Sequence, residues 1–343
     1  MNKNILANLL PDELENLVLS LGFEKYRAKQ IFHSLNNLNE SLKGLKPEQK
    51  KILKESFLFP EAVLEEVFHS KLDGTKKALV KFPDGNMVES VFMRYDFGNS
   101  CCISTQVGCR MGCVFCASGK NGLVRDLEPY EMLSQVRLLE QFGKISHIVL
   151  MGSGEPLDNY ENVLRFIKLI SHESGKNLSL RNITLSTSGL PDKIKMLADE
   201  TLPIGLSLSL HNADQKKREE IMPIAKAHSL EEVKKALMYY QSKNNRRITF
   251  EYTLIANEND SKKDVENIKN FAKGLKCHIN LIKLNPIEEY NRKSTDLQTA
   301  SHFQKLLDKR GLNATIRRTL GADISASCGQ LRNRKLLAVC NRK

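Results

Sequence analysis

Three cysteines lie within one short segment of the chain. Cys109, Cys113 and Cys116 form the pattern Cys-x3-Cys-x2-Cys. Three thiolates at this spacing can hold one face of a cube-shaped iron–sulfur cluster and leave one iron open to another molecule. A structural zinc site is the competing interpretation, but such sites take four closed ligands in paired spacing, and no second pair of cysteines is present. The pattern therefore favours a [4Fe-4S] cluster.

A glycine-rich segment and an isolated cysteine could also take part in chemistry. The segment 152–156 (Gly-Ser-Gly-Glu-Pro) follows a candidate strand, and its glycines would let the backbone approach a ligand closely. Glu155 could accept a hydrogen bond from an ammonium group, although a plain turn is an equal alternative. Cys328 lies in a tail that contains serine and glycine and shows no apolar periodicity. An isolated cysteine is usually a small buried residue, but this tail has no core pattern that would explain it.

Charge and composition narrow the class of protein. The 343 residues include 52 Lys and Arg against 40 Asp and Glu, which leaves a net charge of +12. Such an excess is typical of proteins that bind polyanions, most often nucleic acid, although a solvated basic surface is the plainer alternative. No run approaches the ~20 apolar residues of a membrane span, and the first residues lack a signal core. We therefore expect a cytoplasmic protein without a membrane partner, in which eight cysteines indicate metal binding or catalysis.

The elements that must position these residues change along the chain. Residues up to about 60 predict a small helical bundle, since apolar residues recur at helical spacing. A hairpin follows, with strands predicted at 77–82 and 87–93 around the turn Pro83-Asp84-Gly85-Asn86. Strands and helices then alternate, which predicts a parallel sheet, open or closed into a barrel, with functional groups at the carboxyl ends of its strands. The predicted strands are His147–Met151, Ile183–Ser186, Ile204–Leu210, Ile248–Ile255, Ile279–Leu284 and Ala314–Arg318.

Four separate motifs resemble one family of enzymes. Besides the cysteine triad, they are Cys-Ile-Ser-Thr-Gln-Val-Gly-Cys at 102–109, Gly-Glu-Pro-Leu-Asp-Asn-Tyr at 154–160, Ser-Leu-His at 209–211 and Ala-Ser-Cys-Gly-Gln-Leu at 326–331. Together they resemble the radical SAM RNA adenine methyltransferases, the RlmN/Cfr group, over nearly the whole chain. This resemblance implies an α/β fold, a partial (β/α)6 barrel with a small N-terminal helical domain and a β-hairpin extension.

The resemblance also implies four regions. They are an RNA-binding helical accessory domain at 1–60, a hairpin linker at 61–100, the radical SAM barrel at 101–320, and a tail at 321–343 that carries the methyl-carrier cysteine.

The same resemblance implies two cofactors, a [4Fe-4S] cluster and S-adenosylmethionine (SAM). Cys109, Cys113 and Cys116 would bind the cluster. One electron then cleaves SAM to a 5′-deoxyadenosyl radical, so that the cofactor carries the difficult step and the protein positions it. The residues implied to contact SAM are Gly154, Glu155, Ser186, Ser209, Leu210, His211 and Asn285.

Three further residues receive catalytic roles by the resemblance. Carbon 2 of adenine is electron-poor and does not attack the SAM methyl group directly, whereas a thiolate accepts that methyl group readily. Cys328 would therefore carry the methyl group as S-methylcysteine, and Glu89 would accept the proton lost from carbon 2. Cys102 would resolve the protein–RNA adduct by forming a transient disulfide with Cys328. Two SAM molecules are consumed in each turnover.

The implied substrate is the peptidyl-transferase-centre adenine of 23S rRNA, with an anticodon-loop adenine of tRNA as a second substrate, and the implied electron donor is flavodoxin or ferredoxin. A Cfr-type enzyme that methylates carbon 8 of the same adenine is the alternative. An iron–sulfur RNA-binding protein without catalysis would need no Cys328, Cys102 or Glu89, and a radical SAM enzyme for small molecules would leave the +12 charge unexplained. Candidate phosphate contacts are Lys25, Arg27, Lys29, Lys43, Lys46, Arg246, Arg247, Arg292, Lys293, Arg317, Arg318, Arg332, Arg334, Lys335, Arg342 and Lys343.

Overall fold

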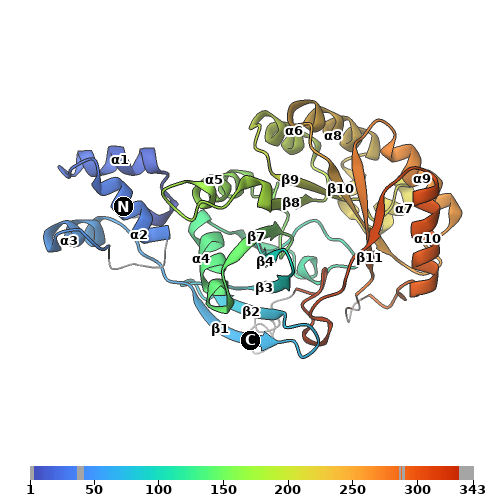
Figure 1. Ribbon diagram of the computed structural model, residues 1–343, viewed down its shortest axis with the longest axis horizontal. Helices are drawn as coiled ribbons and strands as arrows, with labels where there is room; N and C mark the ends of the chain where they lie inside the picture. Colours follow the sequence, from blue (N-terminus) through green and yellow to red (C-terminus); the bar gives the residue numbers. More distant parts are fainter. Residues whose placement is uncertain (1–3, 37–41, 286, 288–289, 332–343) are drawn as a thin grey trace.

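A single ten-stranded mixed sheet forms the centre of the molecule. The computed structural model describes residues 4–36, 42–285, 287 and 290–331. Within these residues the strand order is β1-β2-β3-β4-β7-β8-β9-β10-β11-β12. Figure 1 shows the N-terminal helices α1–α3 at one end of the molecule and the helices α6–α10 at the other, with α4 and α5 between them. The strands are β1 (Val63–His69), β2 (Lys76–Lys81), β3 (Met87–Tyr95), β4 (Gly98–Ile103), β7 (Ile145–Leu150), β8 (Ile183–Thr187), β9 (Gly205–Ser209), β10 (Ile248–Leu254), β11 (Cys277–Lys283) and β12 (Ala314–Ile316).

Three short helices make up the N-terminal part, as the sequence predicted. They are α1 (Pro11–Ser20), α2 (Arg27–Asn36) and α3 (Pro47–Ser56). Proline at the first position of α1 and α3 favours a helix start, because this position needs no backbone N–H. Leu14 and Val18 of α1 are fully buried and belong to the same hydrophobic core as the barrel, so this part packs onto the rest of the chain.

The antiparallel part of the sheet is larger than the predicted hairpin. β2 and β3 form that hairpin, but β1 pairs antiparallel with β2 and adds a strand before it. β3 then pairs antiparallel with β4, the first strand of the parallel series. The prediction missed β1 because this edge strand is only partly buried and its apolar residues do not alternate regularly.

The parallel part consists of six strand–helix units and a short final strand, which confirms the predicted partial barrel. The strands β4, β7, β8, β9, β10, β11 and β12 pair in parallel in this order. Ser229 and Ser261 cap two of the helices, because their side chains accept from the backbone N–H groups of Glu232 and Asp264, three residues further along. The covering helices are α4 (Pro129–Leu139), α5 (Tyr160–Ser171), α6 (Pro191–Asp199), α7 (Gln215–Ile221), α8 (Leu230–Asn244), α9 (Lys262–Ala272) and α10 (Leu297–Lys309).

Side chains alternate along each parallel strand, which separates a core from a polar inner face. In β10, Phe250 and Tyr252 are fully buried in the main core, while Glu251 and Thr253 point to the other side and line a cavity. No helix in the described part of the chain has the length and apolar character needed to cross a membrane.

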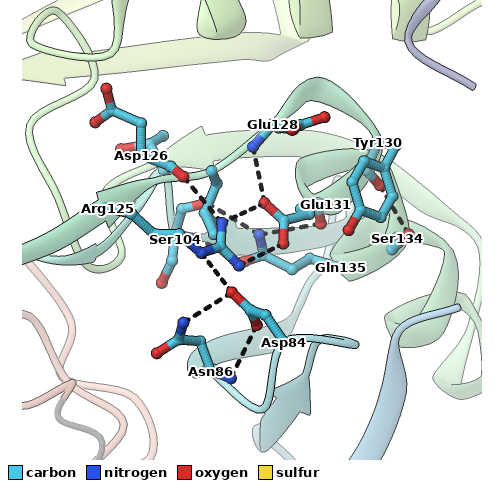
Figure 2. Close-up of polar contacts among 12 residues, drawn as sticks. Asp84, Asn86, Ser104, Arg125, Asp126, Glu128, Tyr130, Glu131, Ser134 and Gln135 are labelled. Atoms are coloured by element: carbon cyan, nitrogen blue, oxygen red, sulfur yellow. Dashed lines mark hydrogen bonds and ion pairs between the residues drawn. The ribbon is translucent and has the colours of Figure 1, made fainter. Parts of the chain in front are cut away.

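A network centred on Arg125 fastens the antiparallel strands to the barrel. Arg125 lies in β6 (Leu123–Asp126), which forms a two-stranded sheet with β5 (Gln106–Gly108). Its guanidinium binds both carboxylate oxygens of Glu131 on α4 at 2.8 Å and Asp84 of the β2–β3 turn at 2.6 Å (Figure 2). One turn further along α4, the side-chain oxygen of Gln135 accepts from Ser104 N, just after β4, at 2.8 Å. The turn, the small sheet and α4 are therefore joined around the strand that leads to the cysteine motif.

Candidate active site

Most of the predicted site residues meet in one cavity at the carboxyl ends of the parallel strands. Cys109, Cys113 and Cys116 line this cavity, and the tail adds Cys328 from the far end of the chain. Cavities at this edge of a β/α sheet are where loops can bring chemical groups together. The predicted SAM contacts that line the cavity are Gly154, Glu155, Ser186, Ser209, His211 and Asn285.

The loop 109–116 that carries the three cysteines is supported from two sides. Val114 N donates to Ile221 O at 3.0 Å, which ties the loop to the end of α7. Ala117 N, directly after the loop, donates to Gly329 O at 2.8 Å. The second bond joins the cysteine loop to the residue that follows Cys328, so the two cysteine-bearing segments are docked on each other.

The three thiols suit a cluster rather than a single metal ion. Among the described residues, no three His, Cys, Asp or Glu side chains gather as ligands of one ion would. In a cubic cluster each thiolate binds a different iron, so the three sulfurs need not converge on one point. Burial raises the pKa of the Cys109 thiol to about 12, and a bound metal is what would stabilise its thiolate form. The donor set therefore fits a [4Fe-4S] cluster.

A buried arginine beside this loop supports the same conclusion. Arg218 of α7 is fully buried, and its Nε and Nη2 donate to the carbonyl oxygens of Leu210, Ser188 and Ser209 at 2.6 to 3.1 Å. Its Nη1 has no hydrogen-bond partner within the described residues. Burial lowers the pKa of Arg218 to about 10, and the Cys113 thiolate opposes this shift. A buried cation without a counter-ion is costly, so an anionic, thiolate-ligated cluster at this loop would offset its charge.

The glycine-rich segment after β7 passes very close to other backbone. Gly154 has a φ of +108°, and a Cβ atom there would lie 2.8 Å from Gln106 N. Only glycine fits this position. Next to it, the buried Glu155 carboxylate accepts from Ser188 N at 2.7 Å and from Leu157 N at 3.1 Å. Burial raises the pKa of Glu155, and these hydrogen bonds oppose the shift. The segment therefore presents a carboxyl group on the cavity wall whose orientation is fixed by hydrogen bonds.

Ser186, Ser209 and His211 stand on neighbouring strands of the same wall. The two serine hydroxyls are 3.4 Å apart and form a hydrogen bond. His211 Nδ1 accepts from Thr253 N at 3.1 Å, which leaves Nε2 as the protonated nitrogen of the neutral ring. Burial is the main cause that lowers the pKa of His211 to about 3. The imidazole is therefore a neutral hydrogen-bond donor in the cavity and not a cation.

Leu210 does not lie on the cavity, in contrast to the SAM contact implied by the sequence. It is fully buried in the main core together with Leu206 and Leu208. These alternate residues of β9 and its end point to the helix side, while Ser209 points inward. The carbonyl oxygen of Leu210 accepts from Arg218 Nε at 3.1 Å, so it is already engaged.

The tail is docked so that Cys328 faces the cavity. Asn285 Nδ2 donates to the Cys328 carbonyl oxygen at 3.0 Å, and both residues line the cavity. At the start of the tail, Gly321 N donates to Asp73 Oδ2 at 2.9 Å on the β1–β2 turn. The predicted tail extends to residue 343, but its residues 332–343 lie outside the described part of the chain, as do the basic residues predicted there.

Cys101 and Cys102 point to opposite sides of β4, because successive residues of a strand face opposite ways. Cys101 belongs to the main core. Cys102 belongs to a smaller cluster on the inner face, in which Leu320 at the end of the barrel region and Leu331 of the tail also pack. Burial raises the pKa of Cys102 to about 12, and the nearby Cys328 adds to the shift. The structure thus places Cys102 next to the segment that carries Cys328.

Two arginines that the sequence suggested as RNA contacts are engaged inside the protein. Arg317 Nη1 lies 3.6 Å from Glu251 Oε2, and Arg317 lines the cavity that contains Cys328. The negative charge of a Cys328 thiolate is the first cause that raises the pKa of Arg317. Arg27 is buried and pairs with Glu24 at 3.3 Å. Neither side chain is a free surface cation, because each forms an ion pair with a carboxylate of the protein.

Glu89 lies on the inner face of β3 but borders a different cavity from Cys328. It is buried, and its carboxylate lies 3.1 Å from Lys77 Nζ. The same Nζ donates to Ser325 O at 3.3 Å, three positions before Cys328. Lys77 therefore links Glu89 to the docked tail, although Glu89 lines the adjacent cavity with Ser118 and other residues.

Sequence reasoning missed Lys77, Arg218 and Arg317 as members of the site. Arg218 and Lys77 lie in polar stretches that resemble solvated surfaces, and only the folded chain buries them. The one available signal was the position of Lys77 next to the apolar run 78–80 of a predicted strand, where a charge on a buried face needs a partner.

Comparison with known proteins agrees with this site. Residues 103–272 match the model of the radical SAM superfamily. A solved structure from Sphaerobacter thermophilus, described as a radical SAM methyltransferase, superimposes with a TM-score of 0.90 at 35% sequence identity, over 96% of this chain and 99% of that one. Superfamily membership implies a [4Fe-4S] cluster and SAM as cofactors.

Curated relatives match almost the entire chain. A probable dual-specificity RNA methyltransferase RlmN from Clostridium botulinum (strain Alaska E43 / Type E3) is 46% identical over 95% of this chain and 96% of its own length. The RlmN protein of Finegoldia magna, with the same description, is 46% identical over 96% of this chain and 97% of its own length. The chain belongs to the RlmN family of radical SAM RNA methyltransferases.

Proposed function

We propose that this enzyme methylates carbon 2 of the peptidyl-transferase-centre adenine in 23S rRNA, and carbon 2 of an anticodon-loop adenine in tRNA. One observation carries the proposal: the tail places Cys328 in the same cavity as the three cluster cysteines. A methyl carrier must reach both the SAM site and the RNA base, and this cavity offers that position. The double substrate is supported by the relatives, which are described as dual-specificity enzymes.

The residues of the chain divide the chemistry among them. Cys109, Cys113 and Cys116 would hold the cluster, which supplies one electron to SAM bound beside it. The sulfur of Cys328 would accept the methyl group from a first SAM and release S-adenosylhomocysteine. Arg317 lines the same cavity. Flavodoxin or ferredoxin is the electron donor that we propose for the second SAM.

Release of the product needs a base and a second thiol. The 5′-deoxyadenosyl radical from the second SAM would remove a hydrogen atom from S-methyl-Cys328, and the resulting methylene radical would add to carbon 2 of the adenine. Return of one electron to the cluster and transfer of the carbon 2 proton to Glu89 would complete the adduct. The Cys102 thiolate would then attack the sulfur of Cys328 and form a disulfide. The bond between this sulfur and the methylene carbon breaks, and that carbon keeps the electron pair and takes up a proton to become the methyl group of the product. The inner-face cluster that contains Cys102 and packs against the tail supports this role. For Glu89 the tail must move, because Glu89 borders the adjacent cavity when the tail is docked.

We also propose that the helical region 1–60 is an RNA-binding accessory domain and that residues 101–320 form the catalytic barrel. Basic residues of the helical part support its role, since Lys25 and Lys29 are exposed. The hairpin linker at 61–100 carries Glu89 and Lys77, and the tail at 321–343 carries Cys328.

The test is mass spectrometry of rRNA and tRNA nucleosides from a host that lacks its own enzyme, with and without this gene. We expect 2-methyladenosine in both RNAs, and none with Cys328→Ala. The Cys102→Ala variant should accumulate a covalent protein–RNA adduct. Appearance of 8-methyladenosine would instead assign the Cfr-type reaction, and absence of both products with an intact cluster would overturn the RNA assignment.

A further inference from the structure

Two aromatic rings form a fixed stack on the turn between β3 and β4. The ring centroids of Tyr95 and Phe97 are 4.8 Å apart with an interplanar angle of 12°. The ring of His147 meets Phe97 edge-on at 5.1 Å. Gly98 follows with a φ of +129°, and a Cβ atom there would collide with the Ser146 side chain. The turn therefore has little freedom, and it holds Phe97 in one place.

Phe97 is far more exposed than is usual for a large aromatic residue. Its side chain is 66% exposed, although large aromatic residues normally bury most of their surface. The Tyr95 ring beside it is partly buried. The stack thus begins inside the protein and ends with a ring that water covers.

The inner end of this stack reaches the methyl carrier. Tyr95 lines a small cavity together with Cys328 and the adjoining residues of the tail. Arg317 and Arg318 line the same cavity. The stack consequently runs from the wall of the cavity that contains Cys328 to the surface at Phe97.

The positive charge near the cavity that Tyr95 lines suits a nucleic acid strand. Arg318 is exposed at the mouth of the same cavity, and the whole chain carries a net charge of +12. Proteins that bind unpaired RNA combine such cations for the phosphates with aromatic rings on which bases stack. An adenine that has to reach Cys328 must leave its own stack, and its neighbours then lose a stacking partner.

We propose that the Tyr95–Phe97 stack binds a nucleobase that flanks the target adenine in the RNA substrate, while Arg318 binds a phosphate beside it. This inference rests on the proposed function, because it takes the RNA that carries the methylated adenine as the occupant. A base that stacks on the exposed ring of Phe97 holds the strand at the opening, so that the extruded adenine enters toward Cys328.

The test is a double-mutant cycle between the protein and its RNA. Binding of a transcript that contains the target adenine is measured for the wild-type holoenzyme and for Phe97→Ala. The same measurement uses transcripts with a single abasic site at each position near the target. We expect Phe97→Ala to weaken binding by about 5- to 150-fold, the range for loss of one base–aromatic stack. One abasic position should weaken binding to the wild type and have little further effect on the variant.

Controls separate stacking from loss of structure. Phe97→Tyr keeps a ring and should retain wild-type binding, and Leu297→Ala removes a similarly exposed apolar side chain (61% exposed) on α10 and should bind normally. Equal binding by wild type and Phe97→Ala would overturn the proposal. The proposal would also be overturned if, at every abasic position, the loss of binding caused by the abasic site simply added to the loss caused by Phe97→Ala. If the wild type makes no methyladenosine in this RNA, the proposed function fails. The coupling between Phe97 and a base is measured by binding alone, so the stacking proposal is tested separately.

Discussion

Acidification should destabilise this protein through His211, and the size of the effect follows from its burial. The pKa of His211 is lowered from 6.5 to about 3 in the folded chain. Below pH 6.5 the unfolded chain binds a proton on this residue that the folded chain does not, so stability falls as the pH decreases from 6.5 towards 3. Each unit is worth about 1.4 kcal/mol, which predicts a loss of about 2 kcal/mol between pH 7.5 and pH 5.

The comparison variant is His211→Asn. Asparagine cannot titrate in this range, and its side-chain oxygen can accept the hydrogen bond that Thr253 N now donates to His211 Nδ1. Asparagine also tolerates the left-handed backbone of this position, which has a φ of +52°. The substitution therefore removes the titration with little other disturbance.

The assay is urea unfolding at a series of pH values from 5 to 7.5. Circular dichroism is the suitable signal, because the chain contains no tryptophan. The unfolding free energy of the wild type should fall more steeply with acidification than that of His211→Asn, and the difference should reach about 2 kcal/mol at pH 5. Parallel curves for the two proteins would refute the reasoning, since they would mean that His211 takes up its proton without unfolding.

Three other substitutions test the site. Gly154→Ala places a Cβ atom 2.8 Å from Gln106 N at a φ of +108°. The affinity for SAM, measured by equilibrium dialysis, should therefore fall at least tenfold. An unchanged affinity would show that this position does not need glycine. Lys77→Met removes the ion pair between Lys77 and the buried Glu89, and the unfolding free energy measured in urea should fall by about 3 kcal/mol. Lys77→Arg should recover most of that unfolding free energy. Arg218→Met should lower the reduction potential of the cluster by about 59 mV, a tenfold change in equilibrium constant, in a redox titration followed by paramagnetic resonance. Arg218→Lys should keep the wild-type potential, and equal potentials for Met and wild type would exclude the charge effect.

The main features of the fold could be predicted because they depend on local patterns. Alternating strands and helices, the capping serines Ser229 and Ser261, and the turn before β3 are all recorded in short stretches of sequence. The edge strand β1 could not be found this way. It is only partly buried, and its place in the sheet depends on pairing with β2.

The site shows the same division. The cysteine triad is recognisable from sequence because all three ligands lie within one loop, so their spacing alone limits what they can bind. The inward direction of Ser209 and the outward direction of Leu210 were not separated, because a motif names neighbouring residues without saying which face of the strand each one takes.

The sequence by itself determined the cysteine triad that we propose as cluster ligands, the order of the β/α units and the family to which the chain belongs. Only the tertiary structure decided which charges are buried and what they touch. Lys77 joins Glu89 to the tail near Cys328, and Arg218 lies fully buried beside the cysteine loop. The physical reason is that burial and ion pairing depend on contacts between segments far apart in the chain. A lysine or arginine in a polar stretch has the same local pattern whether it ends in water or in the core.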